Sequence, residues 1–287
     1  MNAKKITIFC LGVILFGFLS RPARAADDPT NSVWAAEPPK LDGLIDDWAG
    51  VPRGLDKGLS VEYAFRNDDQ NLFVLLVFKN PKLLSTIGQT GVTLYFSPEG
   101  KKDKSRGIRF IQKAVNADEL IAVLEREGKE LTDERKQQLR AKSAYVLYDS
   151  SIVDDKDRVL GPASGSGPSI PPGFRPGRSG GDVVYEFRLP LIKSTDHPAG
   201  IGAAPGQSLK AGVSWGGMTK EMRDAQIAGL SAQGVKATDS GGDLSLPQFD
   251  GEGSTSGRGT PSLEALLRGP KRHTFWTDVI LAAPEAK

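Results

Sequence analysis

Apolar and polar residues alternate with a period of two along much of this chain, the pattern of strands that turn one face to a core. In residues 183–189, large apolar side chains occupy the odd positions, while Glu186 and Arg188 fall on the other face. Residues 61–66 alternate in the same way. After a polar turn, residues 72–78 form a continuous apolar run, typical of a strand covered on both faces. Further strands are expected at residues 91–97, 107–112, 144–149, 209–215 and 275–281.

These strands, with little helix and many turns, predict a mainly β protein of the antiparallel β-sandwich class. We place the sandwich in a single domain, residues 39–283, preceded by an N-terminal lead at residues 26–38. Helical and Gly-rich insertions are expected within it, at about residues 98–142, 161–181 and 219–270.

The three insertions differ in composition. In the first, Asn116 and Glu119 have the spacing of a capping box and Thr132 suits an N-cap, which predicts one or two short helices. The second is dense in Gly, Pro and Ser, a composition that favours a poorly ordered linker. In the third we expect a helix near residues 220–230 and a short one at residues 262–267.

The N-terminus has the three parts of a secretory signal peptide in the required order. Lys4 and Lys5 precede an apolar run at residues 6–19, and Ala23-Arg24-Ala25 provides a small-residue cleavage site. The run is shorter than the roughly 20 residues of a permanent membrane helix. We therefore expect residues 1–25 to be removed and the mature protein to be secreted or periplasmic. An uncleaved anchor is the alternative.

Charge and cysteine content narrow the partners of the mature chain. Cys10, the only cysteine, falls inside the apolar run, so the mature chain would contain no disulfide. Cleavage removes four of the 37 basic residues and none of the 35 acidic ones, which leaves 33 against 35. This near-neutral balance, without a basic stripe interleaved with aromatics, argues against nucleic acid. No later apolar stretch is long enough to span a membrane.

Residues 39–48, which contain Asp42-Gly43 and Asp46-Asp47-Trp48, resemble the opening of the family 9 carbohydrate-binding modules and of the wider DOMON-like sandwiches. The expected strands follow in the order of that family. The resemblance implies a β-sandwich that binds without catalysis, in the best-known members by holding a sugar between aromatic faces. Where the family places a Trp before its central strand, this chain has residues 87–91, and residues 219–270 replace the loop of the second aromatic.

The candidate ligand-binding residues are Trp276, Trp215 and Tyr95. Trp276 has the opposite parity to Phe275 and is expected on an exposed face near Tyr95, where its ring could stack on the apolar face of a sugar. Trp215 shares the parity of the apolar residues of its strand, which favours packing in the core over stacking. Trp48 is expected to plug the sandwich.

No cofactor is expected under this interpretation, and two acidic clusters are the candidates for metal ligands. In the first cluster, Asp42, Asp46 and Asp47 are three acids in one turn, fewer than the six to eight ligands that calcium takes. Turn capping is therefore favoured over a structural calcium for this cluster. The second lacks the Gly and terminal Glu of an EF-hand loop and is typical of a solvated surface. The clusters are Asp42, Asp46, Asp47 and Asp154, Asp155, Asp157.

The sequence favours a non-enzyme, because it contains no nucleophile motif and its only histidines are His197 and His273. Three functions stay open. The first is an exported binding module for a polysaccharide or oligosaccharide. The second is a haem-binding redox domain of the DOMON type, with Met218 or Met222 and one of the histidines as axial ligands. The third is an envelope structural or interaction domain that has lost the sugar slot and binds an envelope protein.

Overall fold

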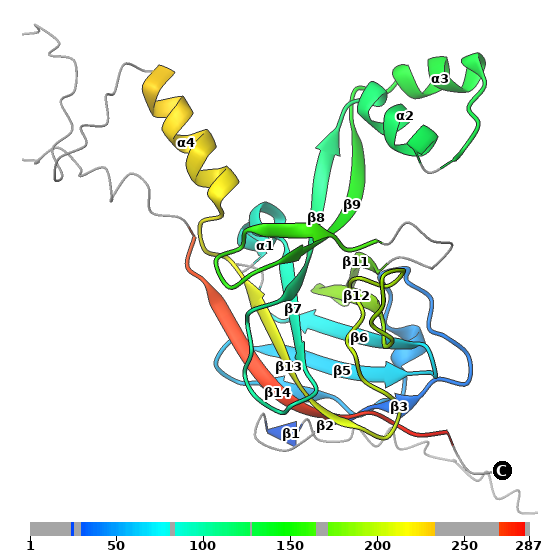
Figure 1. The fold of residues 1–287 in the computed structure, drawn as a ribbon, viewed down its shortest axis with the longest axis vertical. Helices are drawn as coiled ribbons and strands as arrows, with labels where there is room; N and C mark the ends of the chain where they lie inside the picture. Colours follow the sequence, from blue (N-terminus) through cyan, green and yellow to red (C-terminus); the bar gives the residue numbers. More distant parts are fainter. Residues whose placement is uncertain are drawn as a thin grey trace, which may run out of the picture.

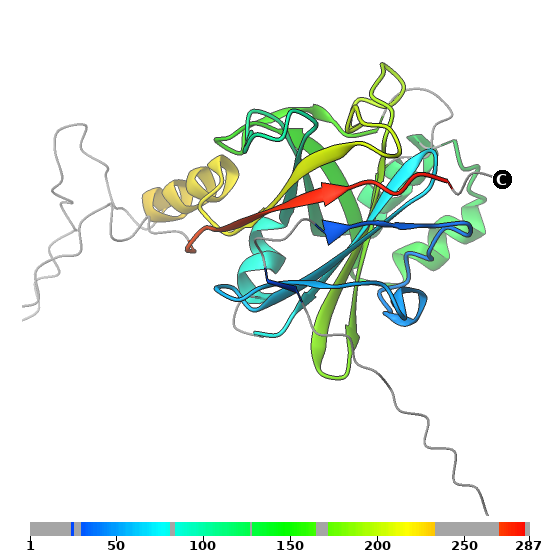
Figure 2. The ribbon, with the colours of Figure 1, turned by 90° about the horizontal axis from the view of Figure 1, so that it is seen from below.

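Two β-sheets pack face to face in the computed structural model, which describes residues 24–25, 30–80, 84–126, 128–164, 172–232 and 270–284 (Figure 1). The view from below shows the two layers, with the strands of one sheet crossing behind those of the other (Figure 2). The fold class expected from the sequence, a mainly β sandwich, is confirmed.

The first sheet has the order β1-β4-β5-β6-β12-β11, with β3 added beside β5. Most of its pairs are antiparallel, and the β5–β6 hairpin lies at its centre. The strands of this sheet are β1 (Arg24–Ala25), β3 (Val33–Trp34), β4 (Gly54–Asp56), β5 (Val61–Asn67), β6 (Asn71–Phe78), β11 (Gly173–Ser179) and β12 (Asp182–Pro190).

The second sheet has the order β10-β9-β8-β7-β13-β14-β2. Its central strands are antiparallel, and only β2 joins in parallel, at the edge of β14. The strands of this sheet are β2 (Thr30–Asn31), β7 (Val92–Ser97), β8 (Gly107–Val115), β9 (Tyr145–Val153), β10 (Val159–Pro162), β13 (Ser208–Trp215) and β14 (His273–Ile280).

The core between the sheets is made by the residues whose alternation predicted the strands. The odd-numbered members of β12, together with Val61 and Phe65 of β5, belong to one buried cluster. Strand β6 contributes to this cluster and also to a second one on its other face, through Phe73 and Leu75, so it is covered on both faces as its continuous apolar run predicts. All the strands expected from the sequence are found.

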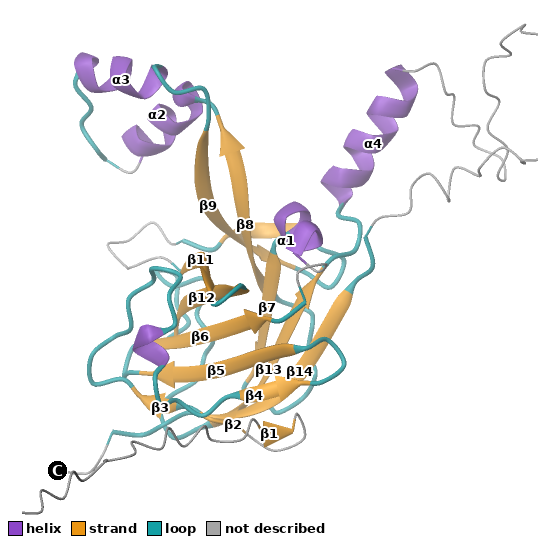
Figure 3. Cartoon of the chain, turned by 180° about the vertical axis from the view of Figure 1, so that it is seen from behind, coloured by secondary structure: helices purple, strands orange, loops and turns teal. Residues whose placement is uncertain are grey.

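The helices lie outside the two layers (Figure 3). Strands β8 and β9 extend beyond the sandwich as an arm that carries α2 (Ala117–Arg126) and α3 (Asp133–Arg140) at its tip. The expected capping box is present, since Glu119 N–H donates to Asn116 Oδ1 and Asn116 N–H donates to Glu119 Oε2. The remaining helices are the short η1 (Asp46–Trp48), α1 (Leu84–Thr90) and α4 (Lys220–Ala232). In the part of the chain that the structure describes, no helix combines the length and apolarity needed to cross a bilayer.

Strand β11 differs from the sequence-based expectation, because it lies within residues 161–181, the segment interpreted as a poorly ordered linker. It pairs with β12 along its whole length, and Phe174 is buried and stacked on Phe187. The open edge of a sheet can order such a segment, because the neighbouring strand supplies backbone hydrogen bonds that the segment cannot form by itself. Local composition does not reveal this pairing. The expected helix at residues 262–267 lies outside the described residues.

The carboxylate of Glu186 fixes the segment of residues 39–48 to the outer face of the first sheet. Its Oε2 accepts from Gly43 N–H at 2.7 Å and from Asp42 N–H at 3.1 Å, and its Oε1 accepts from Trp48 Nε1–H at 2.7 Å. Trp48 therefore covers the outside of this sheet, in the cluster with Phe73, rather than filling the space between the sheets as expected. Asp42, Gly43 and Trp48, the residues on which the family resemblance was based, thus donate hydrogen bonds to one buried acid.

Gly43 and Gly177 are required where this segment crosses β11. Gly43 has φ +82°, and a Cβ at Gly177 would lie 1.9 Å from the carbonyl oxygen of Gly43. A side chain at either position would push the two backbones apart.

A second buried network joins the two sheets at the start of the described chain. Asn67, fully buried at the end of β5, accepts from Ser32 Oγ–H and from Ala282 N–H, and donates to the Ala282 carbonyl oxygen at 3.0 Å. Residues 30–34 pass from β2 in one sheet to β3 in the other at this point. The network therefore ties both ends of the described domain together.

We predict that Glu186→Gln lowers the free energy of unfolding by about 1–3 kcal/mol, because the amide NH₂ would face N–H donors without an acceptor. Burial raises the pKa of Glu186 above its ordinary value, against the opposing effect of the N–H donors of Trp48, Gly43 and Asp42. The folded state therefore holds the proton more tightly than the unfolded chain. Its stability should fall as pH rises from the ordinary glutamate pKa to the raised one.

Urea unfolding of the wild type and of Glu186→Gln between about pH 4 and 8 measures this effect. The pH-dependent loss should be present in the wild type and reduced in the variant. Glu62→Gln, which removes a carboxylate from the same sheet, is the matched control. Identical pH profiles for the wild type and Glu186→Gln would contradict the assignment.

Candidate binding site

Trp215 lies between the two sheets, on the face of β13 that its parity predicts. Its side chain is 2% exposed and packs edge-on against Phe78, while the His273 ring stacks on it at 5.4 Å. The packing role favoured by the sequence is therefore observed, and this ring offers no surface to a ligand.

Trp276 and Tyr95 come together on the outer face of the second sheet, as the sequence predicts. Their ring centroids lie 5.9 Å apart, and both residues flank Gly212 in the strand register. Trp276 is half-buried, with its indole against the Cα of Gly212, whereas Tyr95 is only 1% exposed. Of the three candidate residues, only Trp276 has surface available for stacking.

In the second acidic cluster, which the sequence suggested to be solvated surface, Asp154 and Asp157 are buried and Asp155 is exposed. Asp157 is 7% exposed and forms an ion pair with Arg272, and Asp154 accepts from Arg158 Nε–H at 2.6 Å. Burial raises the pKa of Tyr95 to about 12, and the negative charge of Asp157 adds to this effect. The ion pairs of Asp154 and Asp157 hold this loop in place. The loop therefore closes this part of the outer face to a ligand.

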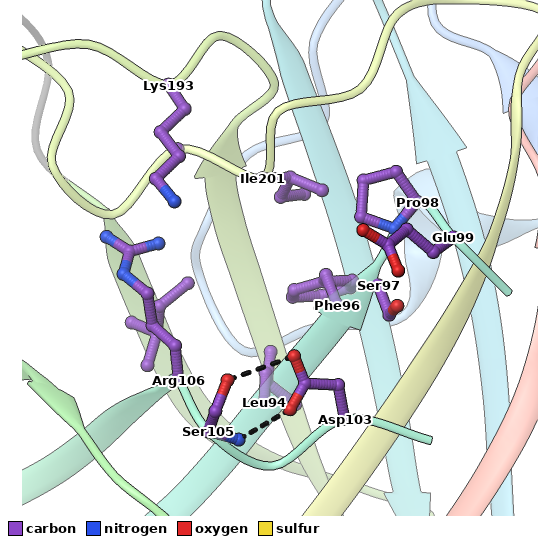
Figure 4. Close-up of a pocket in the computed structure, with 12 residues that line it drawn as sticks. Leu94, Phe96, Ser97, Pro98, Glu99, Asp103, Ser105, Arg106, Lys193 and Ile201 are labelled. Atoms are coloured by element: carbon purple, nitrogen blue, oxygen red, sulfur yellow. Dashed lines mark hydrogen bonds between the residues drawn. The ribbon is translucent and has the colours of Figure 1, made fainter. Parts of the chain in front are cut away.

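A separate pocket opens at one end of the sandwich, where two loops leave the core (Figure 4). One loop, residues 98–106, connects β7 to β8. The other, residues 191–203, follows β12. The cavity between them has a volume of about 240 Å³. Its floor is apolar, formed by Leu94, Phe96 and Ile201.

The loop of residues 191–203 is held against the end of β12 by backbone hydrogen bonds. Ile201 N–H donates to the Pro190 carbonyl oxygen at 3.0 Å, and Gly202 N–H donates to that of Leu191 at 2.8 Å. A Cβ at Gly200 would lie 1.9 Å from the Ile192 carbonyl oxygen, so only glycine permits this approach. The pocket wall that carries Lys193 is therefore fixed by the sheet.

Charged side chains line the mouth of the pocket in two groups (Figure 4). Arg106 and Lys193 lie on one side with their charged ends directed toward one another, and Glu99 and Asp103 lie on the other side. Asp103 is shaped by its own turn, since its carboxylate accepts from Ser105 N–H at 2.8 Å and from Ser105 Oγ–H at 2.9 Å.

Arg106 is half-buried, and burial lowers the pKa of its guanidinium. Within the described parts of the chain, neither Arg106 nor Lys193 forms a hydrogen bond or an ion pair. Burying half of a cation without an acidic partner is unfavourable. The arrangement is therefore one that an anionic or strongly accepting ligand group would stabilise.

A second hollow of about 230 Å³ lies where β9 approaches β11, and it includes Tyr148, Phe174 and Arg188. The Tyr148 ring already carries the Arg175 guanidinium at 4.5 Å from its centroid. Because this face of the ring is occupied, the hollow is a weaker candidate for sugar stacking than the end pocket.

Within the described residues, the side chains considered as metal or haem ligands are not brought together in one site. Asp42 Oδ1 accepts from Leu44 N–H and Asp47 Oδ2 from Lys40 N–H, which is the turn capping that the sequence favoured. In the described ranges, no group of three His, Cys, Asp or Glu side chains gathers as metal ligands. His197 precedes the start of β13, whereas His273 pairs with its last residue, so the two histidines lie at opposite ends of that strand.

Sequence reasoning missed the end pocket, whose polar residues lie in loops that alternation does not describe. One signal was available. Residues 101–106 contain four basic residues and one acid directly after a strand that ends in the core. Residues 87–91, where the family places a Trp, contain no aromatic residue, and Ile87 is buried within helix α1.

Comparisons with known proteins give structural matches alone. No family model matches the chain, and no curated protein matches it. A family 9 carbohydrate-binding module from Caldicellulosiruptor kristjanssonii in complex with glucose matches with a TM-score of 0.33 and 11% identity, over 68% of this chain and 81% of that one. A family 9 module from the same organism in complex with cellotriose matches with a TM-score of 0.32 and 11% identity, over 68% and 80%. This is the family that residues 39–48 resemble. Because these TM-scores are low, the assignment of a sandwich fold relies on the observed strand pairing. The functional argument relies on the chemistry of this protein's own side chains.

We predict that Gly212→Ala displaces the indole of Trp276, because the new Cβ would lie 2.6 Å from its Cζ3. The overpacking should lower stability by about 1–3 kcal/mol and change the near-ultraviolet circular dichroism. Gly229→Ala in α4, where a Cβ meets nothing within 4 Å, is the control and should not destabilise. A wild-type melting curve and spectrum for Gly212→Ala would show that the indole of Trp276 does not pack over Gly212 of β13.

Proposed function

We propose that this protein is an exported, non-catalytic carbohydrate-binding module and that the end pocket between residues 98–106 and 191–203 is its sugar site. The observation that carries the proposal is the convergence of an apolar floor and polar side chains in one small cavity. Sugars present both an apolar C–H face and a ring of hydroxyl groups, so they require both kinds of surface in one place.

The size of the pocket favours a single sugar ring. Its volume of about 240 Å³ lies below the roughly 300–1,000 Å³ of pockets for drug-sized ligands. Phe96 and Ile201 would contact the C–H face, and the carboxylates of Glu99 and Asp103 would accept hydrogen bonds from hydroxyl groups. The openings between the loops would allow the rest of a chain to leave the site.

Binding without catalysis is supported by the charges of the pocket. Its two acids share one side of the mouth, and its bases are Arg and Lys, which stay protonated at neutral pH. The described lining contains no Ser-His or Cys-His pair for nucleophilic chemistry.

Export is the other part of the proposal, and it rests on the charged, apolar and small-residue segments of residues 1–25. We expect N-terminal sequencing of material released from the cytoplasm to begin at Ala26, so cleavage would remove the edge strand β1 from the first sheet. Recovery of a chain that begins at Met1 and stays with the membrane would favour an uncleaved anchor.

We predict that Glu99→Gln weakens saccharide binding about tenfold, because charge-assisted hydrogen bonds from hydroxyl groups are lost. Isothermal titration with monosaccharides and short oligosaccharides measures the effect. Glu37→Gln, which removes an exposed carboxylate from the lead segment, is the matched control and should bind as the wild type does.

Trp276→Ala separates the end pocket from the outer face of the second sheet. It should leave saccharide affinity unchanged if the end pocket is the site. Loss of binding in Trp276→Ala, with binding retained in Glu99→Gln, would move the site to the outer face. A folded wild-type protein that binds no saccharide would refute the proposed function.

A further inference from the structure

We infer that the end pocket selects sugars that carry a carboxylate, the uronic acids, and that Arg106 and Lys193 hold this group. The inference rests on the proposed function and names the ligand class of the same site.

The first step is the convergence of two like charges. The Arg106 guanidinium and the Lys193 ammonium point toward one another across one side of the pocket (Figure 4). Within the described residues, neither has an acidic partner. Two adjacent cations repel one another, and an anion placed between them would replace this repulsion with two attractions. The positive charge on this side of the pocket thus has no acidic partner among the described residues.

The second step is the charge of the loop around them. Residues 101–106 also contain Lys101, Lys102 and Lys104, against a single acid in that segment, Asp103. These three lysines do not line the pocket, and Lys104 Nζ donates to Thr274 Oγ1 at 3.4 Å. The Asp103 carboxylate already accepts two hydrogen bonds from Ser105. The positive charge of this loop adds a longer-range attraction for an anion to that of Arg106 and Lys193, although the mature protein is near neutral overall.

The third step separates a carboxylate on a sugar ring from a free anion. A guanidinium matches a carboxylate with two parallel hydrogen bonds. Glu99 and Asp103, on the other side, would repel an anion that has no hydrogen atoms to donate. A uronic acid meets both sides, because its carboxylate faces the cations while its hydroxyl groups donate to the acids. The apolar floor at Phe96 and Ile201 takes the ring between them.

The experiment compares D-glucuronate with its methyl ester, D-glucose and acetate by isothermal titration against the full mature chain. The ester keeps the ring and hydroxyl groups, loses the negative charge and adds one methyl group. We expect glucuronate to bind about tenfold more tightly than the ester, as one charge-assisted hydrogen-bonded pair provides. This difference should shrink with added salt, and acetate should bind far more weakly than glucuronate.

Substitutions assign the preference to the two cations. Arg106→Gln should reduce the affinity for glucuronate about tenfold and leave that for the ester unchanged, and Lys193→Gln should act in the same direction with a smaller effect because Lys193 is exposed. Lys57→Gln, which removes an exposed charge next to β4, is the matched control. Lys193→Gln keeps the test decisive even if Arg106→Gln unfolds.

The outcomes distinguish this inference from the proposed function. Equal affinity for glucuronate, its ester and glucose would overturn the inference and leave sugar binding intact. Acetate binding as tightly as glucuronate would overturn it in favour of a plain anion site. Failure of every sugar to bind would overturn the proposed function itself.

Discussion

The buried carboxylate of Glu186 fixes the segment of residues 39–48 to strand β12, and the same strand leads into one wall of the pocket. Three N–H groups from residues 42–48 converge on this side chain, which is fully buried on the outer face of the first sheet. A carboxylate so placed requires its donors, because an unpaired buried charge costs several kcal/mol. Beyond Pro190, the same strand continues into the loop that carries Lys193 and Ile201, tied back to the strand end by backbone hydrogen bonds. Strand β12 thus carries Glu186 on the outer face of the sheet and leads into the loop that forms one wall of the pocket.

The pocket differs from the rest of the surface in how its charges are arranged. On the outer face of the second sheet, acids and bases meet in pairs at two places, Asp157 with Arg272 and Lys210 with Asp278. At the end pocket the signs are separated, with Arg106 and Lys193 on one side and acids on the other. Separated charges around an apolar floor are poor for stability and suited to a ligand with an anionic end and a hydroxylated end.

The fold was predictable from the sequence because burial of one or both faces of a strand leaves a recognisable pattern of apolar residues. Alternation placed β5, β12, β13 and β14 correctly, and the continuous run of β6 predicted burial on both faces. Local capping signals at Asn116 and Thr132 located α2 and α3. Strand β11 was missed because its order comes from pairing with β12, a long-range contact that local composition does not encode.

The site was less predictable, since aromatic residues attract attention wherever they occur. Parity assigned Trp215 to the core and Trp276 to the outer face, but it did not reveal that the loop of Asp157 covers Tyr95. The pocket joins two loops about 90 residues apart, each polar and unremarkable in isolation, and only the folded sheets bring Arg106 and Lys193 together.

A crystal structure of the mature protein with bound D-glucuronate tests the central claim most directly. The account predicts electron density for the sugar over Phe96, with its carboxylate between Arg106 and Lys193 and hydroxyl groups directed at Glu99. Density for the sugar stacked on Trp276, with the end pocket empty, would contradict it.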